Sequence, residues 1–482
     1  MPAETRATSA ANAAGSVVLP LALAQFIASY AASNMNVAIT AIAKDLHTDV
    51  AGIQTAITLF TLTMAALMVP GSKLTDIWGR KLCFILGLTI YGIGAVLAAV
   101  SQGLGLLIFG YSLLEGVGSA LLIPPIYILV TLLFDDMQTR AKWFGAVSGA
   151  GALGAAAGPL IGGLITSYIS WRASFLFQAL VVAAIAWVAW RRVIDPPLPS
   201  ERSSFDVIGA LLSAAGLFFL VFGILQTNKD GWGSATVWLY VAVGVVLLAA
   251  FLLYARAREH SGRVPLISPS LFTSRTSNLG LTTQLAQWLI LQGSFFVISV
   301  FLQNVRHYSA IKTGLMLVPG TIGILLAAAF AQRMASRHPQ RRLVRAGFTM
   351  TTIGLALLLV LARAHSAVWT FWPGLFFMGL GVGIMVTASV NVVQSAWPQA
   401  KQGDISGVSR SFSNLGSSLG VAIAGSILVI HAEGNTQFAA ALAVMGGVAI
   451  VGWVAALLLP AAQGPGNGRK GERSQTSVTG TH

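Results

Sequence analysis

The chain has 482 residues, of which 55% are hydrophobic and only 9% are charged. Soluble domains carry about 25% charged residues, so this composition excludes an ordinary water-soluble protein and predicts one embedded in a bilayer. The net charge of +14 would also suit a nucleic-acid-binding protein, but the basic residues are spread over short loops between apolar runs. We therefore expect no nucleic-acid partner.

Apolar runs long enough to cross a bilayer as helices follow one another along the whole chain. We count fourteen, near residues 17–40, 51–71, 83–101, 104–128, 143–167, 173–190, 207–226, 235–255, 278–302, 311–332, 344–362, 368–394, 406–430 and 437–460. The sequence thus predicts an all-α membrane protein with fourteen transmembrane helices.

The basic residues predict the orientation of these spans. If both termini are cytoplasmic, few basic residues lie outside, namely Lys44, Arg172, Lys229, Arg306, Lys312 and Arg363. The other lysines and arginines fall inside, in agreement with the positive-inside rule.

The first span and the loop after the second carry the earliest polar patterns. Gln25, Ser29 and Asn36 line one side of a helix. The loop from Gly71 to Lys81 has a turn glycine, and its charged residues can pair with charges or helix ends across the cytoplasmic face. Its candidate residues are Asp76, Gly79, Arg80 and Lys81. The plainer interpretation is a basic inside loop.

The fourth span contains Glu115, the sole carboxylate deep in any predicted span. Ser112, Glu115 and Ser119 follow at i, i+3 and i+7, which predicts one shared helix face. A charge at this depth costs several kcal/mol, roughly 2.5–3.5 on insertion scales, unless it faces a cavity, finds a partner or stays protonated.

The fifth span contains a run of glycines around a proline. Gly154, Gly158, Pro159, Gly162 and Gly163 read G-x-x-x-G-P-x-x-G-G. Glycines four apart offer a flat groove to a neighbouring helix, while the proline removes a backbone donor and bends the helix. Close helix packing alone would also explain such pairs.

Two markers repeat along the chain. Gly416 and Gly420 in the thirteenth span follow the pattern of Gly154 and Gly158, 262 residues earlier. The basic loops before Lys81 and Arg342 are offset by about 260 residues. We therefore expect two six-helix halves with spans seven and eight inserted between them. The predicted parts are a disordered tail 1–15, a half 16–193, a linker with two helices 194–277, a half 278–460 and a disordered tail 461–482.

The ninth span repeats the polar face of the first. Gln284, Trp288 and Gln292 follow at i, i+4 and i+8, with Phe295 nearby. Amide and aromatic groups suit broad recognition of flat lipophilic cations, so we expect both faces and the Ser112 and Ser119 hydroxyls to line a substrate cavity. Ordinary hydrogen bonding between helices is the alternative.

Several of these motifs resemble one family. The sequence is similar to the fourteen-helix drug/proton antiporters of the major facilitator superfamily. The resemblance rests on the proline-glycine motif, the Gly71–Lys81 loop, Asn36–Ile39, Ser170–Phe175, Asp206–Gly209 and Ser406–Ala422. It implies the major facilitator fold, a location in a bacterial inner (cell) membrane, and efflux of lipophilic, often cationic, small molecules in exchange for protons. It also implies a monomer in contact with membrane lipid.

The chain departs from this pattern at the charges. Ala31 and Ser112 stand where the family often has Asp and Arg, so its usual coupling residues cannot be carried over. We expect Glu115 to load and release the coupling proton, the alternative being a permanently protonated residue that only hydrogen-bonds to a neighbouring helix. Arg410 could pair with Asp404 or lipid phosphate, or replace the missing arginine.

The sequence has no features of an enzyme or a metal site. Cys83 is the only cysteine, all seven histidines fall in loops or the tail, and there is no nucleotide loop or catalytic triad. We therefore predict no enzymatic activity, no cofactor and no metal. A dedicated exporter of one antibiotic, siderophore or lipid is the alternative to multidrug efflux, and a non-transporting sensor or scaffold is a further one.

Overall fold

The computed structural model describes residues 3–134, 137–193, 205–363, 365–398, 401–428 and 434–460. Every regular element within these ranges is helical. Fourteen membrane spans in this described part of the chain are long and apolar enough to cross a membrane, and their order matches the predicted spans. The stretch 194–204 of the predicted linker and the predicted tail 461–482 lie outside the described residues.

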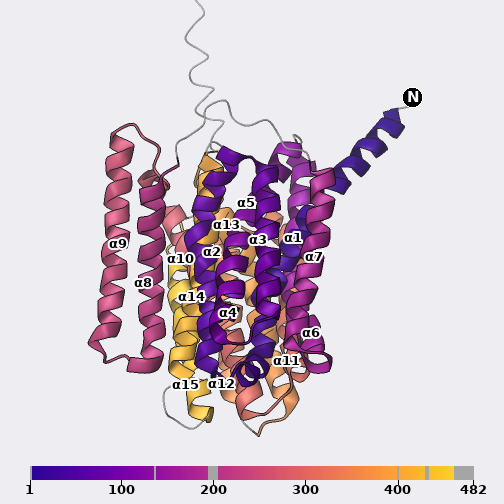
Figure 1. Ribbon diagram of the computed structural model, residues 1–482. Coiled ribbons are helices and arrows are strands. Elements are labelled where there is room, and N and C mark those ends of the chain that lie inside the picture. Colours follow the sequence, from indigo (N-terminus) through magenta and orange to yellow (C-terminus); the bar gives the residue numbers. More distant parts are fainter. Residues whose placement is uncertain are drawn as a thin grey trace, which may run out of the picture.

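The N-terminal group of helices contains the first six spans (Figure 1). Its elements are α1 (Ala3–Asp45), α2 (Val50–Trp78), α3 (Arg80–Ala99), α4 (Leu104–Leu107), the π-helix η1 (Ile108–Glu115), α5 (Gly116–Leu133), α6 (Met137–Tyr168) and α7 (Trp171–Arg192). Helices α4, η1 and α5 together form the fourth span. The first turns of α1, from Ala3, project away from the bundle beside the point marked N.

The next two helices stand at the edge of the bundle. Figure 1 shows α8 (Val207–Asp230) and α9 (Ala235–His260) side by side, with α8 on the inner side. Helix α8 packs on α2 and α14, whereas α9 packs chiefly on α8. In the apolar 18-residue segment of α9, only 17% is buried, whereas 89% of the corresponding segment of the ninth span is buried. The pair is therefore peripheral, with much of its apolar surface left for lipid.

The C-terminal group contains the last six spans. Its elements are η2 (Pro269–Phe272), α10 (Arg275–Val300), η3 (Phe301–Val305), α11 (Ala310–Arg337), α12 (Gln340–Leu361), η4 (Val368–Phe371), α13 (Trp372–Ser395), α14 (Gln402–Leu428) and α15 (Gly434–Leu457). Helix α10 packs on α13, α14 and α15, which makes it the centre of this group.

Small residues set the tightest helix contacts in both groups. Helix α1 packs against α6, and α10 packs against α14 in the same manner. At Gly154, a Cβ atom would overlap the backbone of Phe26, and at Gly416 it would overlap the backbone of Leu285. Gly154 and Gly416, which are 262 residues apart, thus make equivalent contacts.

Candidate functional site

The proline-glycine motif of α6 joins helices from both groups. Gly158 lies so close to Ser33 of α1 that a Cβ atom would overlap its hydroxyl. Across the bundle, Gly314 of α11 lies against the Pro159 backbone, and a Cβ at Gly163 would come within 2.8 Å of the Ala310 carbonyl oxygen. One side of the motif therefore holds α1 while the other touches α11.

The close contacts between α6 and α11 lie toward one end of α6, from Pro159 onward. Near that end, Ser167 Oγ accepts a hydrogen bond of 2.9 Å from the Ile311 amide. Toward the other end, a Cβ atom at Gly145 or Gly149 would have no neighbour within 4 Å. The two helices are thus in contact at the predicted outer end, while α6 faces open space at the end that carries the basic loops.

Helices α1 and α10 with η3 also meet near the predicted outer end. The Gln303 side chain of η3 accepts a hydrogen bond of 2.8 Å from the Thr40 hydroxyl and donates one of 2.8 Å to the Asn36 carbonyl. This amide therefore bridges the first and ninth spans through one side chain.

Helices α2 and α14 form a second seam that runs along their length. Gln54 Nε2 donates to the Ala422 carbonyl (3.1 Å), and Ser411 Oγ donates to the Ala65 carbonyl (2.5 Å). The seam ends at the basic loop with an ion pair of 2.5 Å between Lys73 Nζ and Asp404 Oδ1. Polar contacts therefore tie the two groups together from end to end along this line.

The loop after α2 has the turn that its glycine predicts. Gly79 adopts φ 103°, a conformation that L side chains rarely adopt, and its amide donates to the Thr75 carbonyl. Arg80 is buried and pairs with Asp76 at 3.3 Å, while Lys81 lies 6.0 Å from the Trp190 ring. Asp76 and Arg80 thus pair within the loop.

The Lys73–Asp404 ion pair yields a testable prediction. Both groups are partly exposed, so the pair contributes about 0–1 kcal/mol and its loss leaves the melting temperature nearly unchanged. We expect Asp404→Lys to slow transport, because like charges then face each other where α2 meets α14. The double exchange Lys73→Asp with Asp404→Lys should restore the rate, and a rate equally low in the double variant would contradict this role.

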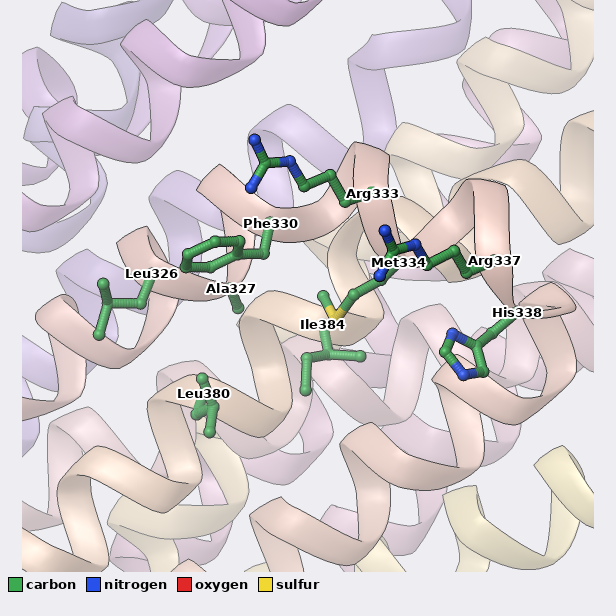
Figure 2. A pocket seen from close by; sticks show the side chains of 9 residues that line it. All are labelled: Leu326, Ala327, Phe330, Arg333, Met334, Arg337, His338, Leu380 and Ile384. Atoms are coloured by element: carbon green, nitrogen blue, oxygen red, sulfur yellow. The ribbon is translucent and has the colours of Figure 1, made fainter.

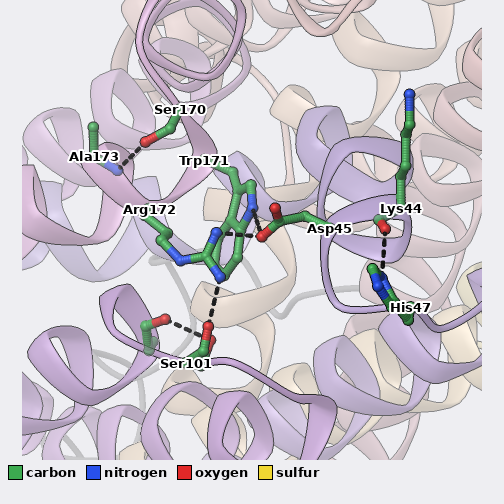
Figure 3. Close-up of polar contacts among 9 residues, drawn as sticks. Lys44, Asp45, His47, Ser101, Ser170, Trp171, Arg172 and Ala173 are labelled. Carbon is green, nitrogen blue, oxygen red and sulfur yellow. Dashed lines mark hydrogen bonds and ion pairs between the residues drawn. The ribbon is translucent and has the colours of Figure 1, made fainter.

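A polar cluster joins three segments at the predicted outer end (Figure 3). Asp45, which ends α1, accepts hydrogen bonds from Arg172 and from Trp171 Nε1 (3.1 Å) at the start of α7. Arg172 also donates to the Ser101 carbonyl (2.7 Å), and Ser170 caps α7 by accepting from the Ala173 amide (3.1 Å). The Ser170–Phe175 motif therefore links the end of α1, the α3–α4 loop and the start of α7 through hydrogen bonds.

Glu115 ends the π-helix η1 and is fully buried. A π-helix is a wide turn that occurs often at functional sites. Here it packs on Gly94 of α3, where a Cβ would come within 2.8 Å of the Glu115 amide nitrogen. Neither carboxyl oxygen of Glu115 has a hydrogen-bond partner of standard geometry among the described residues. Ser112 and Glu115 contact different helices across this π-turn. Ser112 Oγ donates a hydrogen bond to the Ala56 carbonyl of α2 (2.7 Å).

Buried polar side chains that the sequence analysis did not single out surround Glu115. Tyr91 of α3 and Tyr111 of η1 are buried near its carboxyl group. The Tyr91 hydroxyl donates to Gln178 Oε1 of α7 at 2.6 Å, and the Gln178 amide nitrogen is buried without a described partner. A tyrosine in the middle of an apolar span was the available signal, because tyrosines gather at membrane interfaces.

Gln25 and Ser29 are linked through Tyr127 to a cation from the other group of helices. Gln25 donates to Ser29 Oγ (3.3 Å) and accepts from the Tyr127 hydroxyl of α5 (3.4 Å). The guanidinium carbon of Arg410, on α14, is 4.6 Å from the centre of the Tyr127 ring. Asp404, the partner considered for Arg410, forms its ion pair with Lys73 instead. The predicted α1 face thus meets Arg410 through Tyr127.

The polar side chains of the predicted α10 face contact two different groups of helices. The Gln284 side chain bonds Ser409 of α14 at 2.7 Å, within its own group of helices. Gln292 instead reaches α1, where its amide donates weakly to the Ala32 carbonyl (3.5 Å). The remaining predicted cavity residues are Asn36, Ser119, Trp288 and Phe295, of which Trp288 is partly buried and the others are buried.

The comparisons with known proteins agree with this architecture. The model of the Major Facilitator Superfamily matches residues 21–421 and again 322–480. The chain is 28% identical over 417 residues to the methylenomycin A resistance protein of Bacillus subtilis, covering 86% of this chain and 88% of that protein. It is 28% identical over 402 residues to a probable actinorhodin transporter of Streptomyces coelicolor, covering 82% and 68% of the two chains.

A multidrug relative and a solved structure complete the comparison. The chain is 27% identical over 384 residues to the multidrug efflux pump LfrA of Mycolicibacterium smegmatis, covering 80% and 75% of the two chains. The crystal structure of the human organic anion transporter MFSD10 (TETRAN) superposes with a TM-score of 0.60 at 14% identity, over 92% of this chain and 99% of that one. Since the family model spans most of the chain, this multi-pass membrane protein belongs to the Major Facilitator Superfamily.

Proposed function

We propose that this protein exports lipophilic, often cationic, small molecules from the cytoplasm of a bacterium in exchange for protons. It acts as a monomer in the inner membrane, with both termini in the cytoplasm. Relatives named as resistance, export and multidrug efflux proteins support the direction of transport and a drug or antibiotic as the substrate. The basic loops, exemplified by Lys81 and Arg342, support the orientation.

The one-sided contact between α6 and α11 carries the proposal. Two six-helix halves, α1–α7 and α10–α15, rock against each other around a site near the midplane, while α8 and α9 are an insertion between them. The halves meet at Gly163 and Ala310, whereas α6 is open at Gly145. Such an arrangement corresponds to an inward-facing state that receives substrate from the cytoplasm.

The substrate site lies where α1, α5, α10 and α14 approach one another. Gln25, Ser29 and Gln292 supply amides and a hydroxyl, and Tyr127 supplies an aromatic face. Arg410 repels cations from its own end of the site, which directs a cationic group toward the amides. Few fixed charges and several adaptable polar groups suit chemically varied ligands.

Proton coupling in this proposal depends on Glu115. Because the carboxyl is fully buried, a charge there would be costly, and movement of the halves changes that cost. Protonation and substrate release are thereby linked through one residue. Tyr91 lies beside the carboxyl and is itself held by its hydrogen bond to Gln178 of α7.

Export can be tested with a fluorescent cation. We expect an efflux-deficient bacterium that expresses the protein to accumulate less ethidium than vector cells, because the proposed site binds such cations and the proposed cycle moves them outward. Collapse of the proton gradient with a protonophore should remove the difference. Equal accumulation with and without the protein, across ethidium and a panel of lipophilic drugs, would contradict broad export.

A dedicated exporter is the second candidate, and the relatives supply its specific support. Several are named for single antibiotics, among them the probable actinorhodin transporter and the cephamycin export protein CmcT of Amycolatopsis lactamdurans. Resistance of the expressing strain to one compound class alone in the same panel would favour this function over multidrug efflux.

A further inference from the structure

Ionisable side chains lie in contrasting surroundings in the two groups of helices. In the C-terminal group, Arg337 lines a groove of about 610 Å³ between α11 and α13, whose apolar wall includes Leu326 and Phe330 (Figure 2). Those two apolar side chains are 42% and 49% exposed, so the groove is open to the surroundings of the bundle. In the N-terminal group, Glu115 is fully buried, so neighbouring side chains rather than solvent determine how its proton is held.

Backbone contacts between α3 and the fourth span place Tyr91 beside Glu115. A Cβ atom at Gly94 would come within 2.8 Å of the Glu115 amide nitrogen, and one at Gly118 would come within 2.6 Å of the Tyr91 amide nitrogen. The two glycines therefore let the backbones approach closely on both sides of the pair. Both side chains are fully buried, and the Tyr91 hydroxyl lies near the carboxyl group.

The single hydrogen of the Tyr91 hydroxyl is already committed to α7. It is donated to Gln178 Oε1 at 2.6 Å, which leaves only oxygen lone pairs for Glu115. A neutral carboxyl group has a hydrogen to donate to these lone pairs, whereas an ionised one has none. Neither carboxyl oxygen accepts a hydrogen bond of standard geometry from the described residues. Because a buried carboxylate without a donor is costly, this arrangement suits neutral Glu115.

The Gln178 side chain can change its role without losing another contact. Its Nε2 atom is buried and has no hydrogen-bond partner among the described residues. Turning the amide over by 180° exchanges the acceptor for a donor, and Nε2 then donates to the Tyr91 oxygen. The Tyr91 hydrogen becomes available to Glu115. A hydrogen bond to a charged acceptor is roughly twice as strong as a neutral one, so ionisation of Glu115 favours the turned amide.

We propose that the Tyr91–Gln178 hydrogen bond reverses its direction when Glu115 loses its proton. With neutral Glu115, Tyr91 donates to Gln178 and accepts from the carboxyl O–H. When the carboxyl proton leaves for solvent during the transport cycle, the Tyr91 hydrogen turns to the carboxylate and Gln178 donates to Tyr91. Tyr91 stays neutral throughout, so no proton passes along it. Gln178 is thus a positioning residue, and the inference rests on the proposed role of Glu115 as proton carrier.

Tyr111 differs from Tyr91 in having no link of this kind. These two tyrosines, from η1 and α3, are the titratable groups that the described part of the chain places near the carboxyl. The Tyr111 ring stacks on Phe60 of α2 at 4.6 Å, and its hydroxyl has no hydrogen-bond partner among the described residues. Through its hydroxyl, Tyr91 therefore connects the protonation of Glu115 to α7, and Tyr111 does not.

Infrared difference spectroscopy of the purified full-length protein in lipid vesicles, recorded as a function of pH, tests the proposal. We expect a carboxyl C=O band that is absent in Glu115→Gln and an amide C=O band that is absent in Gln178→Met. Both bands should titrate together, because the Gln178 carbonyl loses its hydrogen bond as Glu115 ionises. Carbon-13 labelling of glutamine in the wild type assigns the amide band without any substitution at this position.

Tyr91→Phe should separate the two bands. The amide band should vanish, because Gln178 no longer has a hydroxyl to follow. The carboxyl band should remain, with its midpoint moved to higher pH by about one unit, because the ionised carboxyl loses a charge-assisted donor whereas the neutral one loses only an acceptor.

The matched control is Tyr30→Phe. Tyr30 is also fully buried, and its hydroxyl bonds Ser174 of α7 at 2.9 Å, one turn from Gln178. Both bands should titrate there as in the wild type, and an equal shift of the midpoint would overturn the proposal. A carboxyl band that titrates without the amide band would overturn this inference alone. Absence of a Glu115-dependent carboxyl band at every pH would overturn it together with the proton-carrying role, while ethidium accumulation measures export separately.

Discussion

Cells that express Glu115→Gln are expected to accumulate as much ethidium as vector cells, because the variant cannot load or release a proton. Glutamine keeps the size of the side chain, and the site is already fully buried, so the protein should fold and reach the membrane normally. Exchange of labelled for unlabelled substrate across vesicles without a gradient should persist, since it needs no proton. Accumulation assays and vesicle exchange, at matched protein levels, measure the two activities separately.

The control for this prediction is the same substitution at an exposed carboxylate. Glu259, at the end of α9, is exposed and contacts Ser268, so Glu259→Gln should export ethidium like the wild type. Unchanged efflux with unchanged pH dependence in Glu115→Gln would sink the role of this residue and leave export itself standing. Loss of exchange together with efflux would mean that Glu115 binds substrate or supports the fold rather than carrying the proton.

The second large effect is expected at Gly154, where even one methyl group has no space. A Cβ atom there would meet backbone atoms of Phe26, which cannot move aside as a flexible side chain would. Overpacking of this kind typically costs about 1–3 kcal/mol. Gly154→Ala should therefore lower the melting temperature of the purified protein and reduce efflux, because α1 and α6 must separate slightly along their whole contact.

Gly145 on the same helix provides the comparison for Gly154. A Cβ at Gly145 has nothing within 4 Å, so Gly145→Ala should leave the melting temperature unchanged or raise it through better helix propensity, by up to about 1 kcal/mol. A similar loss in both variants would show that glycine matters for helix flexibility and not for the close approach of α1.

The number and order of the spans could be predicted because both depend on local hydropathy. A bilayer requires apolar runs of about 20 residues, and each run from residue 17 to residue 460 meets that length. All fourteen predicted spans correspond to helices of the structure. The glycine motifs were equally local, and the packing of Gly154 and Gly416 on backbone follows from the lack of a side chain.

The surroundings of Glu115 could not be predicted in the same way. The spacing of Ser112, Glu115 and Ser119 predicts one face only if the helix is regular, and the π-turn before Glu115 changes that geometry. Ser112 consequently bonds α2 while Glu115 lies beside Tyr91 of α3. Helical periodicity specifies directions within one helix, but the identity of the facing helix is a long-range property.

For the charged residues too, some properties follow from the local sequence and others depend on the tertiary structure. Hydropathy, charge asymmetry and glycine spacing are sufficient for an all-α membrane bundle with basic loops on one side, because each acts over a few turns of helix. The partners of Asp404 and Arg410 depend on how α14 meets α2 and α5, since these residues are hundreds of positions apart in the chain. Lys73 binds Asp404 and Tyr127 faces Arg410 because helix packing brings them within reach, and no local pattern records that distance.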